Sequence, residues 1–468
     1  MLCLKPLTLN RLRCVVALSV VAGVAVTSTG VETAVRPPKF DYQLHTLDNG
    51  LTVVLSEDHS TPIVHLQLVY HVGSKNERPG RTGFAHLFEH LMFKGSRNVP
   101  SDTHLTLVSR VGGEGNAFTT EDTTTYLETV PAQYLPLVLW LEADRMATLR
   151  IDRQTFEAER QVVKEERRWR YEDTPFGLLT EILYDQAYSV HPYKHTAIGS
   201  MEDLEAASVE HVQEFFDTYY VPENATLVLV GDFESAEALA LVKQYFDRVP
   251  KAARPVPRDI PREPPQTEQR RITLTASQNW PLPAVVVAHH ITYDGHPDAY
   301  PLHIAAKVLS DGQSSRIFRR LVYDEQIAVS ASGAGSLIED PNLFYAVSIV
   351  QPGSSPADSE TALIDELERL KTELISDDEL QRAKNQFARD YVFTRATVEQ
   401  KANHLSHAAV IHDDITTADG EFDIFMNITK ADVQRVARTY FTEQNRMVLT
   451  VQPPVSRGRS FLRPGDGQ

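Results

Sequence analysis

The sequence predicts an α+β fold in which two homologous domains each place helices over a mostly antiparallel sheet. Three observations favour this class: a hairpin signal near residue 50, an alternating apolar segment after it, and a proline-rich run beyond which the order strand, strand, helix recurs. With 468 residues, 42% of them hydrophobic, the chain is long enough to bury two cores. A diverged duplication is the hypothesis that this repeated order suggests.

The first strands are expected on either side of Asp48-Asn49-Gly50, because Asn-Gly favours a two-residue hairpin turn. This turn would join residues 42–47 to residues 51–56. From Val64 to Val72, apolar residues alternate with others, as in a strand that buries one face. Helix boundaries are expected at Gly112-Gly113, which would end a helix, and at Ser200 and Ser208, which would cap two others.

Prolines are densest between residues 250 and 265, and this composition predicts a linker. Beyond it we expect strands at residues 271–276 and 284–291 and a helix at residues 298–309. The predicted bounds are 40–250 for the first domain, 251–271 for the linker, 272–455 for the second domain and 456–468 for a disordered tail.

Residues 1–30 are predicted to be a secretory signal peptide. Basic residues precede an apolar stretch, Cys14 to Val26, that is short for a membrane span. Both cysteines of the chain, Cys3 and Cys14, lie in this segment, so the mature protein would have no disulfide. We therefore expect a periplasmic or secreted bacterial protein without stable membrane insertion. An uncleaved membrane anchor and a mitochondrial transit peptide are the alternatives.

The charge balance argues against nucleic acid as a partner. The chain carries 63 Asp and Glu against 46 Lys and Arg, a formal net charge of -17. An acidic protein can attract basic peptides, but a solvated acidic surface accounts for the same composition.

The segment His86-Leu87-Phe88-Glu89-His90 has the spacing of a metal site. On a helix, positions i and i+4 share one face, so His86 and His90 can direct two imidazoles at one ion. Glu89 lies beside that face, where its carboxylate can act as a base on water. H-x-x-E-H is the inverzincin pattern of zinc peptidases. Two unrelated histidines on a packed helix are the alternative interpretation.

A third ligand is expected downstream, because a hydrolytic zinc ion usually has three protein ligands and one open position. Residues 157–169 contain strong helix formers and no Gly or Pro. Glu159 and Glu166 are two helical turns apart and lie on one stripe, whereas Glu165 lies well round the helix. The periodicity therefore favours Glu166, although a solvated charged helix would show the same composition.

Together these segments resemble the pitrilysin-like zinc metallopeptidases, the inverzincin family of insulin-degrading enzyme and the mitochondrial processing peptidase. The resemblance rests on Gly83 to Gly95 and on Glu159-Arg-Gln-Val-Val-Lys-Glu-Glu166. It implies that His86, His90 and Glu166 hold one Zn²⁺, that Glu89 is the catalytic base and that Glu159 assists catalysis. It also implies two homologous domains arranged as half of a clamshell.

Further segments are similar to the family in the same order. Gly112-Gly-Glu-Gly-Asn116-Ala117-Phe118-Thr119 resembles the edge strand that receives the substrate backbone, so Asn116 to Thr119 are the implied substrate-binding residues. Residues 191–199 and 220–232 also match. The resemblance spans roughly residues 40 to 450 and is weaker after residue 232.

The second half departs from the family. Complete enzymes carry an Arg and a Tyr seven residues apart there, and Val322 and Val329 stand in those places. Valine donates no hydrogen bond, so these positions cannot stabilise an oxyanion. The chain therefore resembles the zinc-bearing subunit of the short heterodimeric bacterial members. A homologous partner would supply the Arg/Tyr pair.

The predicted function is a zinc-dependent endopeptidase that hydrolyses peptides or unfolded polypeptides by metal-activated water. The alternative is a non-catalytic peptide-binding or assembly subunit with a structural zinc. The absence of cysteine from the predicted mature chain disfavours it, because structural zinc sites are usually rich in cysteine.

Overall fold

The computed structural model describes residues 36–276 and 279–454. The predicted signal peptide (1–30) and tail (456–468) lie outside the described residues. From Lys39 onward, the described residues belong to one compact unit. Within the described part of the chain, no helix is both long and apolar enough to cross a membrane.

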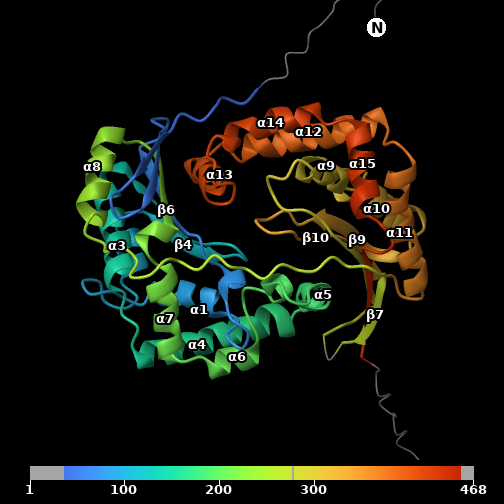
Figure 1. The fold of residues 1–468 in the computed structure, drawn as a ribbon, viewed down its shortest axis with the longest axis horizontal. Coiled ribbons are helices and arrows are strands. Elements are labelled where there is room, and N and C mark those ends of the chain that lie inside the picture. Colours follow the sequence, from blue (N-terminus) through green and yellow to red (C-terminus); the bar gives the residue numbers. More distant parts are fainter. Residues whose placement is uncertain (1–35, 277–278, 455–468) are drawn as a thin grey trace, which may run out of the picture. The chain divides into compact units, whose positions relative to one another are not determined.

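The first half of the unit contains a six-stranded sheet with the order β1-β2-β6-β3-β5-β4 (Figure 1). All neighbouring strands are antiparallel except β2 and β6, which run parallel, so the predicted mostly antiparallel sheet is confirmed. The strands are β1 (Gln43–Thr46), β2 (Thr52–Glu57), β3 (Ile63–Tyr70), β4 (Glu114–Thr119), β5 (Thr124–Pro131) and β6 (Ala225–Gly231).

The predicted hairpin at Asp48-Asn49-Gly50 is confirmed. β1 pairs with β2 across it, and the N–H of Gly50 donates to the carbonyl of Leu47 at 2.9 Å. Gly50 has φ +94°, a conformation that glycine adopts without strain. The Asn49 amide also donates to the carbonyl of Phe246 at 2.8 Å, which ties the turn to a helix end far along the chain.

Helices pack on one face of this sheet and enclose the first apolar core. The helix predicted at residues 157–169 begins earlier, at Arg153, because Asp152 caps it by accepting from the N–H of Thr155. The caps at Ser200 and Ser208 are confirmed. The helices are α1 (Phe84–Leu91), α2 (His104–Arg110), α3 (Leu135–Thr148), α4 (Arg153–Arg167), α5 (Leu179–Ala187), α6 (Met201–Ala206), α7 (Val209–Tyr219) and α8 (Ser235–Phe246), with a π-helical turn at Arg168–Glu172.

The second half repeats this topology in a five-stranded sheet with the order β7-β11-β8-β10-β9. Its one parallel pair, β7 and β11, takes the place of β2 and β6, and the remaining neighbours are antiparallel. The matching strand succession supports the duplication hypothesis. The strands are β7 (Arg270–Thr275), β8 (Ala284–His290), β9 (Ala328–Gly335), β10 (Leu343–Val350) and β11 (Arg446–Gln452).

The helices of the second half cover its own sheet, and one of them also covers strands β3 and β6 of the first sheet. The predicted helix at residues 298–309 is confirmed as α9. The helices are α9 (Ala299–Ser310), α10 (Arg316–Phe318), α11 (Pro356–Thr372), α12 (Asp377–Phe393), α13 (Val398–Val410), α14 (Thr417–Asn427) and α15 (Lys430–Tyr440), with a π-helical turn at Arg319–Asp324.

The prediction that β3 buries only one face is wrong. Every residue of the strand after Ile63 is buried, including His65 and Gln67. The reason is α13, which packs against β3 and β6 and places the hydroxyl of Ser406 2.9 Å from the Gln67 amide, which donates to it. A helix from the other half therefore covers the second face of the first sheet.

The proline-rich segment forms neither helix nor strand from residue 251 to residue 269. It is nevertheless tied to the first half by Glu263. The carboxylate of Glu263 accepts from the backbone N–H groups of Ser189, Val190 and His191 at 2.8, 2.9 and 2.9 Å. Charge-assisted hydrogen bonds of this kind are stronger than neutral ones, so the segment runs along a defined path.

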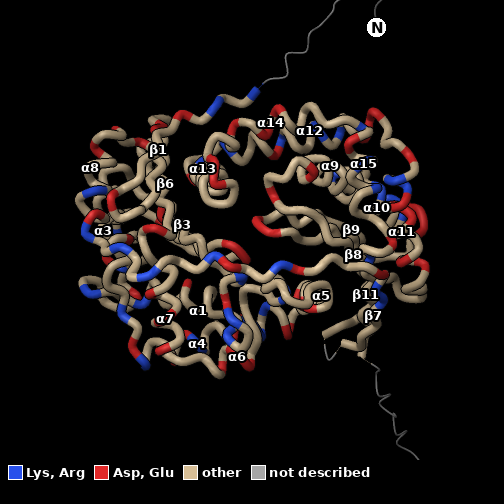
Figure 2. The backbone as a smooth tube through the Cα atoms, in the orientation of Figure 1, with Lys and Arg blue, Asp and Glu red and all other residues tan. Residues whose placement is uncertain are grey.

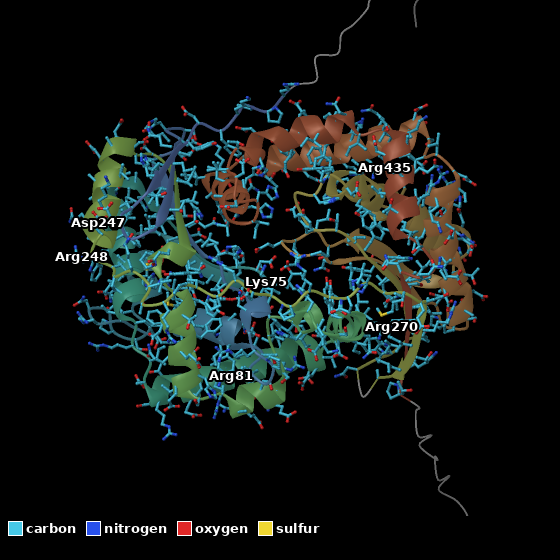
Figure 3. All side chains as sticks on the ribbon, viewed as in Figure 1. Lys75, Arg81, Asp247, Arg248, Arg270 and Arg435 are labelled. Atoms are coloured by element: carbon cyan, nitrogen blue, oxygen red, sulfur yellow. The ribbon has the colours of Figure 1, made fainter. Side chains whose placement is uncertain are left out.

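Charged residues of both signs are interspersed along the chain (Figure 2). Most lie outside the cores, as do the exposed residues Asp247 and Arg248 at the left edge of the view in Figure 3 and Arg435 over the helices at its upper right. Lys75 is different: it lies well inside the view, and its side chain is only 4% exposed. A buried lysine needs compensating charges, which are described with the candidate site.

Glu379 offers a test of the packing between α10 and α12. Its carboxylate caps α12 and accepts from Arg316 at 2.6 and 2.9 Å, which lowers the pKa of Glu379 to about 2. Because the pKa is lowered, its stabilisation is full above pH 4.5 and is lost as the pH falls toward 2. We expect Glu379→Gln to reduce the free energy of unfolding by about 1–2 kcal/mol at pH 7, after discounting for solvent screening.

Urea unfolding at pH 7 and pH 4 would measure this effect. The difference between the variant and the wild type should shrink at the lower pH. Glu373→Gln is the control, because Glu373 is 59% exposed and its pair with Arg369 should contribute little. An equal loss of stability in both variants, or a loss independent of pH, would contradict the assignment.

Candidate metal site

Two histidines of α1 and one glutamate of α4 converge at the contact between these helices. His86 Nε2 and His90 Nε2 lie 3.8 and 3.4 Å from the same oxygen, Oε2 of Glu166. The three ligand atoms all lie within 4.8 Å of one another. Ligands of tetrahedral zinc at bond lengths of about 2.0–2.1 Å are separated by roughly 3.3 Å, so this donor set fits a zinc ion.

Glu165 does not take part in this convergence. Its side chain is 68% exposed and pairs with Arg168 on the outer side of α4. The other oxygen of Glu166 lies 2.8 Å from Arg170, a neighbour that the sequence analysis did not single out. Arg170 orients the carboxylate so that Oε2 faces the two imidazoles.

Glu89 points from α1 toward β4. The hydroxyl of Thr119 donates to Glu89 Oε2 at 2.6 Å. Burial raises the pKa of the Glu89 carboxyl, against a lowering effect of the Thr119 hydrogen bond. A carboxylate with a raised pKa is a better proton acceptor near neutral pH. Thr119, expected only as a substrate-binding residue, therefore also orients Glu89.

Glu159 lies behind His90. Its Oε2 is 3.4 Å from His90 Nδ1, and its Oε1 forms an ion pair with Lys94 Nζ at 2.9 Å. Burial alone would lower the pKa of His90, but the carboxylates of Glu159 and Glu166 raise it to about 9. In contrast, burial lowers the pKa of His86 to about 4. The two carboxylates therefore favour a protonated His90 ring, and a divalent cation can take the place of the proton on Nε2, the nitrogen that faces Glu166.

A buried carboxylate that the sequence analysis missed holds the start of α1. Glu77 accepts from the backbone N–H groups of Gly83 and Ala85 at 2.9 and 2.7 Å. These N–H groups have no partner inside the helix, so Glu77 satisfies them. The spacing between Glu77 and Gly83 matches no capping pattern, and only the folded loop brings them together.

Two glycines of the segments that resemble the family lie in contact. Gly83 and Gly199 both have positive φ, 86° and 71°, and a Cβ on Gly199 would lie 2.3 Å from the Gly83 nitrogen. Arg167 also donates to the Gly199 carbonyl at 2.7 Å. The loop before α6 can approach α1 this closely only because neither residue has a side chain.

The strand β4, which contains Asn116 to Thr119, forms the edge of the first sheet. Among the described strands it pairs only with β5. A cavity of about 320 Å³ lies between β4 and α1, and it is lined by Glu89, His90, Phe93, Lys94, Asp102, Leu105, Asn116, Ala117 and Glu159. Phe118 instead lines a second cavity, together with Asn403 and His407 of α13, and is 40% exposed. An open strand edge thus runs beside the converging ligands.

Val322 and Val329 offer no donor in the second half. Val322 packs against the second core, and Val329 is 45% exposed on β9. Of the neighbouring polar side chains, Arg320 pairs with Glu325 at 2.7 Å, and Tyr323 is 72% exposed. These contacts agree with an ordinary surface role for the arginine.

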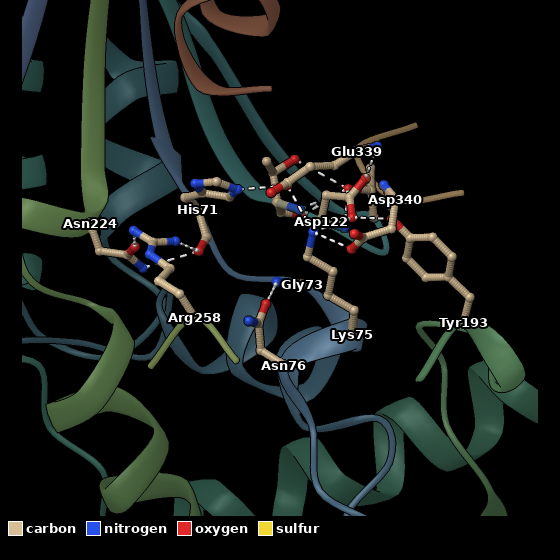
Figure 4. Close-up of polar contacts among 12 residues, drawn as sticks. His71, Gly73, Lys75, Asn76, Asp122, Tyr193, Asn224, Arg258, Glu339 and Asp340 are labelled. Carbon is tan, nitrogen blue, oxygen red and sulfur yellow. Dashed lines mark hydrogen bonds and ion pairs between the residues drawn. The ribbon is translucent and has the colours of Figure 1, made fainter. Parts of the chain in front are cut away.

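A polar network joins the two halves (Figure 4). Lys75 of the first half lies 3.0, 2.8 and 3.1 Å from Asp122, Glu339 and Asp340, the last two in the β9–β10 connection. His71 also contacts Glu339 at 2.6 Å, and the Tyr193 hydroxyl donates to Asp122 at 2.6 Å. Three carboxylates compensate the buried ammonium, and the network holds the β9–β10 turn against the first half.

Comparison with known proteins gives two consecutive family matches. A model described as insulinase (peptidase family M16) matches residues 52–200, and one described as the peptidase M16 inactive domain matches residues 206–387. The chain is a pitrilysin-like member of peptidase family M16. The predicted family and the fold of two layered domains are therefore confirmed.

Relatives of similar length carry zinc protease names. The chain is 29% identical to "Zinc protease PqqE" of Helicobacter pylori over 87% of its own length and 92% of the relative. It is 24% identical to "Uncharacterized zinc protease YmxG" of Bacillus subtilis, covering 86% and 97%. A crystal structure of a protease from Helicobacter pylori superimposes with a TM-score of 0.85 at 29% identity, covering 88% of this chain and 100% of that one.

A more distant likeness shows the fold alone. The periplasmic protease PqqL from Escherichia coli superimposes with a TM-score of 0.73 at 18% identity, covering 88% of this chain and 48% of that one. The names of the M16 relatives imply that zinc is the metal of the family. His86, His90 and Glu166 are donor groups that fit this ion.

Proposed function

We propose that this chain is a zinc-dependent endopeptidase that hydrolyses peptides or unfolded polypeptides and acts in the periplasm or outside the cell. The observation that carries the proposal is the convergence of His86, His90 and Glu166 beside Glu89 at an open strand edge. The zinc protease names of the relatives support the reaction class. The predicted signal peptide and the periplasmic relative support the location.

His86, His90 and Glu166 would hold one zinc ion, which supplies Lewis-acid polarisation of the scissile carbonyl and lowers the pKa of water. Glu89 accepts the proton of the attacking water and later delivers it to the leaving amine. The Thr119 hydroxyl holds the Glu89 carboxylate in place at 2.6 Å. Glu159 and Lys94 fix the ring of His90 from the side opposite Glu166.

The edge of β4 would bind the substrate backbone as an added strand, through Asn116 to Thr119. This mode requires an extended segment and therefore favours peptides over folded proteins. The cavity of about 320 Å³ beside Glu89 would receive a substrate side chain next to the scissile bond.

We further propose that the chain is the catalytic subunit of a heterodimer. Val322 and Val329 cannot donate hydrogen bonds to an oxyanion, so a homologous partner would supply the Arg and Tyr found in complete enzymes. The alternative of a non-catalytic subunit with a structural zinc is disfavoured. The cluster lies beside Glu89, a carboxylate placed to act as a base, and beside a cavity at an open strand edge, features that a structural zinc does not need.

A quenched fluorescent peptide assay tests the proposal. Removal of zinc with a chelator should abolish turnover, and one equivalent of added zinc should restore it. The matched control is His86→Ala, which should remain inactive after the same addition. If zinc-free protein, verified by elemental analysis, cleaves the peptide at the original rate, the proposal fails. Peptide binding by zinc-loaded protein without cleavage, with and without the partner, would favour the alternative.

A further inference from the structure

A second group of histidine and carboxylate side chains lies in the second half, away from the candidate active site. Asp294 is in the connection between β8 and α9, His407 is in the last turn of α13, and His412 follows that helix. Asp294 Oδ2 lies 2.7 Å from His407 Nε2 and 3.2 Å from His412 Nε2. The three atoms all lie within 4.8 Å of one another, as in the first site.

His412 and Asp294 are each oriented by a hydrogen bond to the polar atom that does not face the cluster. His412 Nδ1 bonds to the Thr417 hydroxyl at 2.8 Å, which directs Nε2 toward Asp294. Asp294 Oδ1 accepts from the N–H of Gly295 at 2.9 Å, which leaves Oδ2 for the two imidazoles. Metal-binding histidines and carboxylates typically have such supporting bonds.

His412 gives the independent indication that a ligand belongs here. Its side chain is only 5% exposed, yet Nε2 has no hydrogen-bond partner within the described residues. Asp294 Oδ2 lies at 3.2 Å, within ion-pair distance of the protonated ring but outside hydrogen-bond geometry for Nε2. A buried imidazole nitrogen without a partner is costly, and a cation between it and Asp294 would satisfy it.

We propose that Asp294, His407 and His412 bind a divalent transition-metal ion, of the class that imidazole ligands prefer, such as Zn²⁺, Co²⁺ or Ni²⁺. The separation of 3.2 Å between Asp294 and His412 is near the roughly 3.3 Å of a tetrahedral site, and the 2.7 Å between Asp294 and His407 would widen when the ion binds. Room for further ligands exists, because a cavity of about 460 Å³ is lined by Asp294, His407 and Glu421, among others. Water or the Glu421 carboxylate can complete the coordination.

The position of the ligands assigns this ion a fastening role. Asp294 belongs to a loop of the second half, and its backbone N–H donates to the carbonyl of Ile338 at 2.8 Å. His407 belongs to α13, which covers β3 and β6 of the first half. An ion that joins them therefore holds α13 between the first sheet and the loop after β8. None of its three ligands lines the cavity beside Glu89, so we assign the ion no part in peptide hydrolysis.

Metal counting on the full chain tests the proposal separately from catalysis. We use His86→Ala protein, whose first site is disabled, and measure bound Zn²⁺ or Co²⁺ by equilibrium dialysis and elemental analysis. One equivalent should remain in this protein, and none when His407→Gln or His412→Gln is added. His296→Gln, in the same loop as Asp294 but outside the cluster, is the matched control and should keep one equivalent.

Thermal unfolding supplies the second readout. The metal should raise the Tm of the His86→Ala protein by roughly 2–5 °C at concentrations far above Kd, and the rise should vanish with His407→Gln. His407 is 48% exposed, so this variant should fold, and its metal-free Tm verifies that. Less than 0.1 equivalent bound by His86→Ala protein, or one equivalent retained after either His407→Gln or His412→Gln, would overturn the proposal.

Discussion

Replacement of Glu89 by Gln should lower kcat/KM for peptide hydrolysis by about 10³-fold, while the protein retains its zinc. The size follows from general acid–base catalysis, which typically contributes 10²–10⁴-fold. The amide of Gln still accepts from the Thr119 hydroxyl but cannot take up a proton, so the variant isolates the proton-transfer role from the packing role. Turnover of a quenched peptide and zinc content by elemental analysis measure the two quantities.

Glu165→Gln is the matched control for this experiment. Glu165 is next to Glu166 in sequence but is 68% exposed, so its replacement should leave turnover and zinc content unchanged. Turnover by Glu89→Gln within threefold of the wild type would rule out Glu89 as the base. Loss of zinc from the same variant would place Glu89 among the ligands instead.

Addition of the homologous partner should raise kcat/KM of this chain by about 100-fold or more. Loss of a single oxyanion donor typically costs 10²–10³-fold, and Val322 and Val329 leave both donor positions empty. The expected partner is a homologue that lacks the H-x-x-E-H motif and has the Arg/Tyr pair. Steady-state kinetics at increasing partner concentration would measure the activation and the affinity together.

The control is the same partner with its Arg changed to Met and its Tyr changed to Phe. That pair of substitutions should preserve complex formation, measured by size-exclusion chromatography, and should remove the activation. Full activity of the isolated chain, unchanged by the partner, would contradict the heterodimer. The zinc endopeptidase proposal would survive that result, because it rests on the first half alone.

Much of the first half is predictable from local patterns. The Asn-Gly turn, the caps at Ser200 and Ser208 and the extended helix around Glu159 each depend on neighbours within a few residues, and the structure has all of them. The stripe argument also favours Glu166 over Glu165, and the structure places Glu166 beside His86 and His90.

Features that depend on distant segments are not predictable in this way. The burial of both faces of β3 requires α13, which is encoded in the other half of the chain. Glu77 caps α1 through a loop whose path no local pattern specifies. Asp294 and His407 are more than a hundred residues apart in sequence, so only the folded chain reveals their contact.

We propose above that His86, His90 and Glu166 hold one zinc ion. Diffraction data from crystals of the zinc-loaded protein, collected above and below the zinc absorption edge, test it most directly. We predict an anomalous peak bonded to Nε2 of both histidines and to Oε2 of Glu166. An empty position there, or a peak in which another side chain replaces Glu166, would contradict the account.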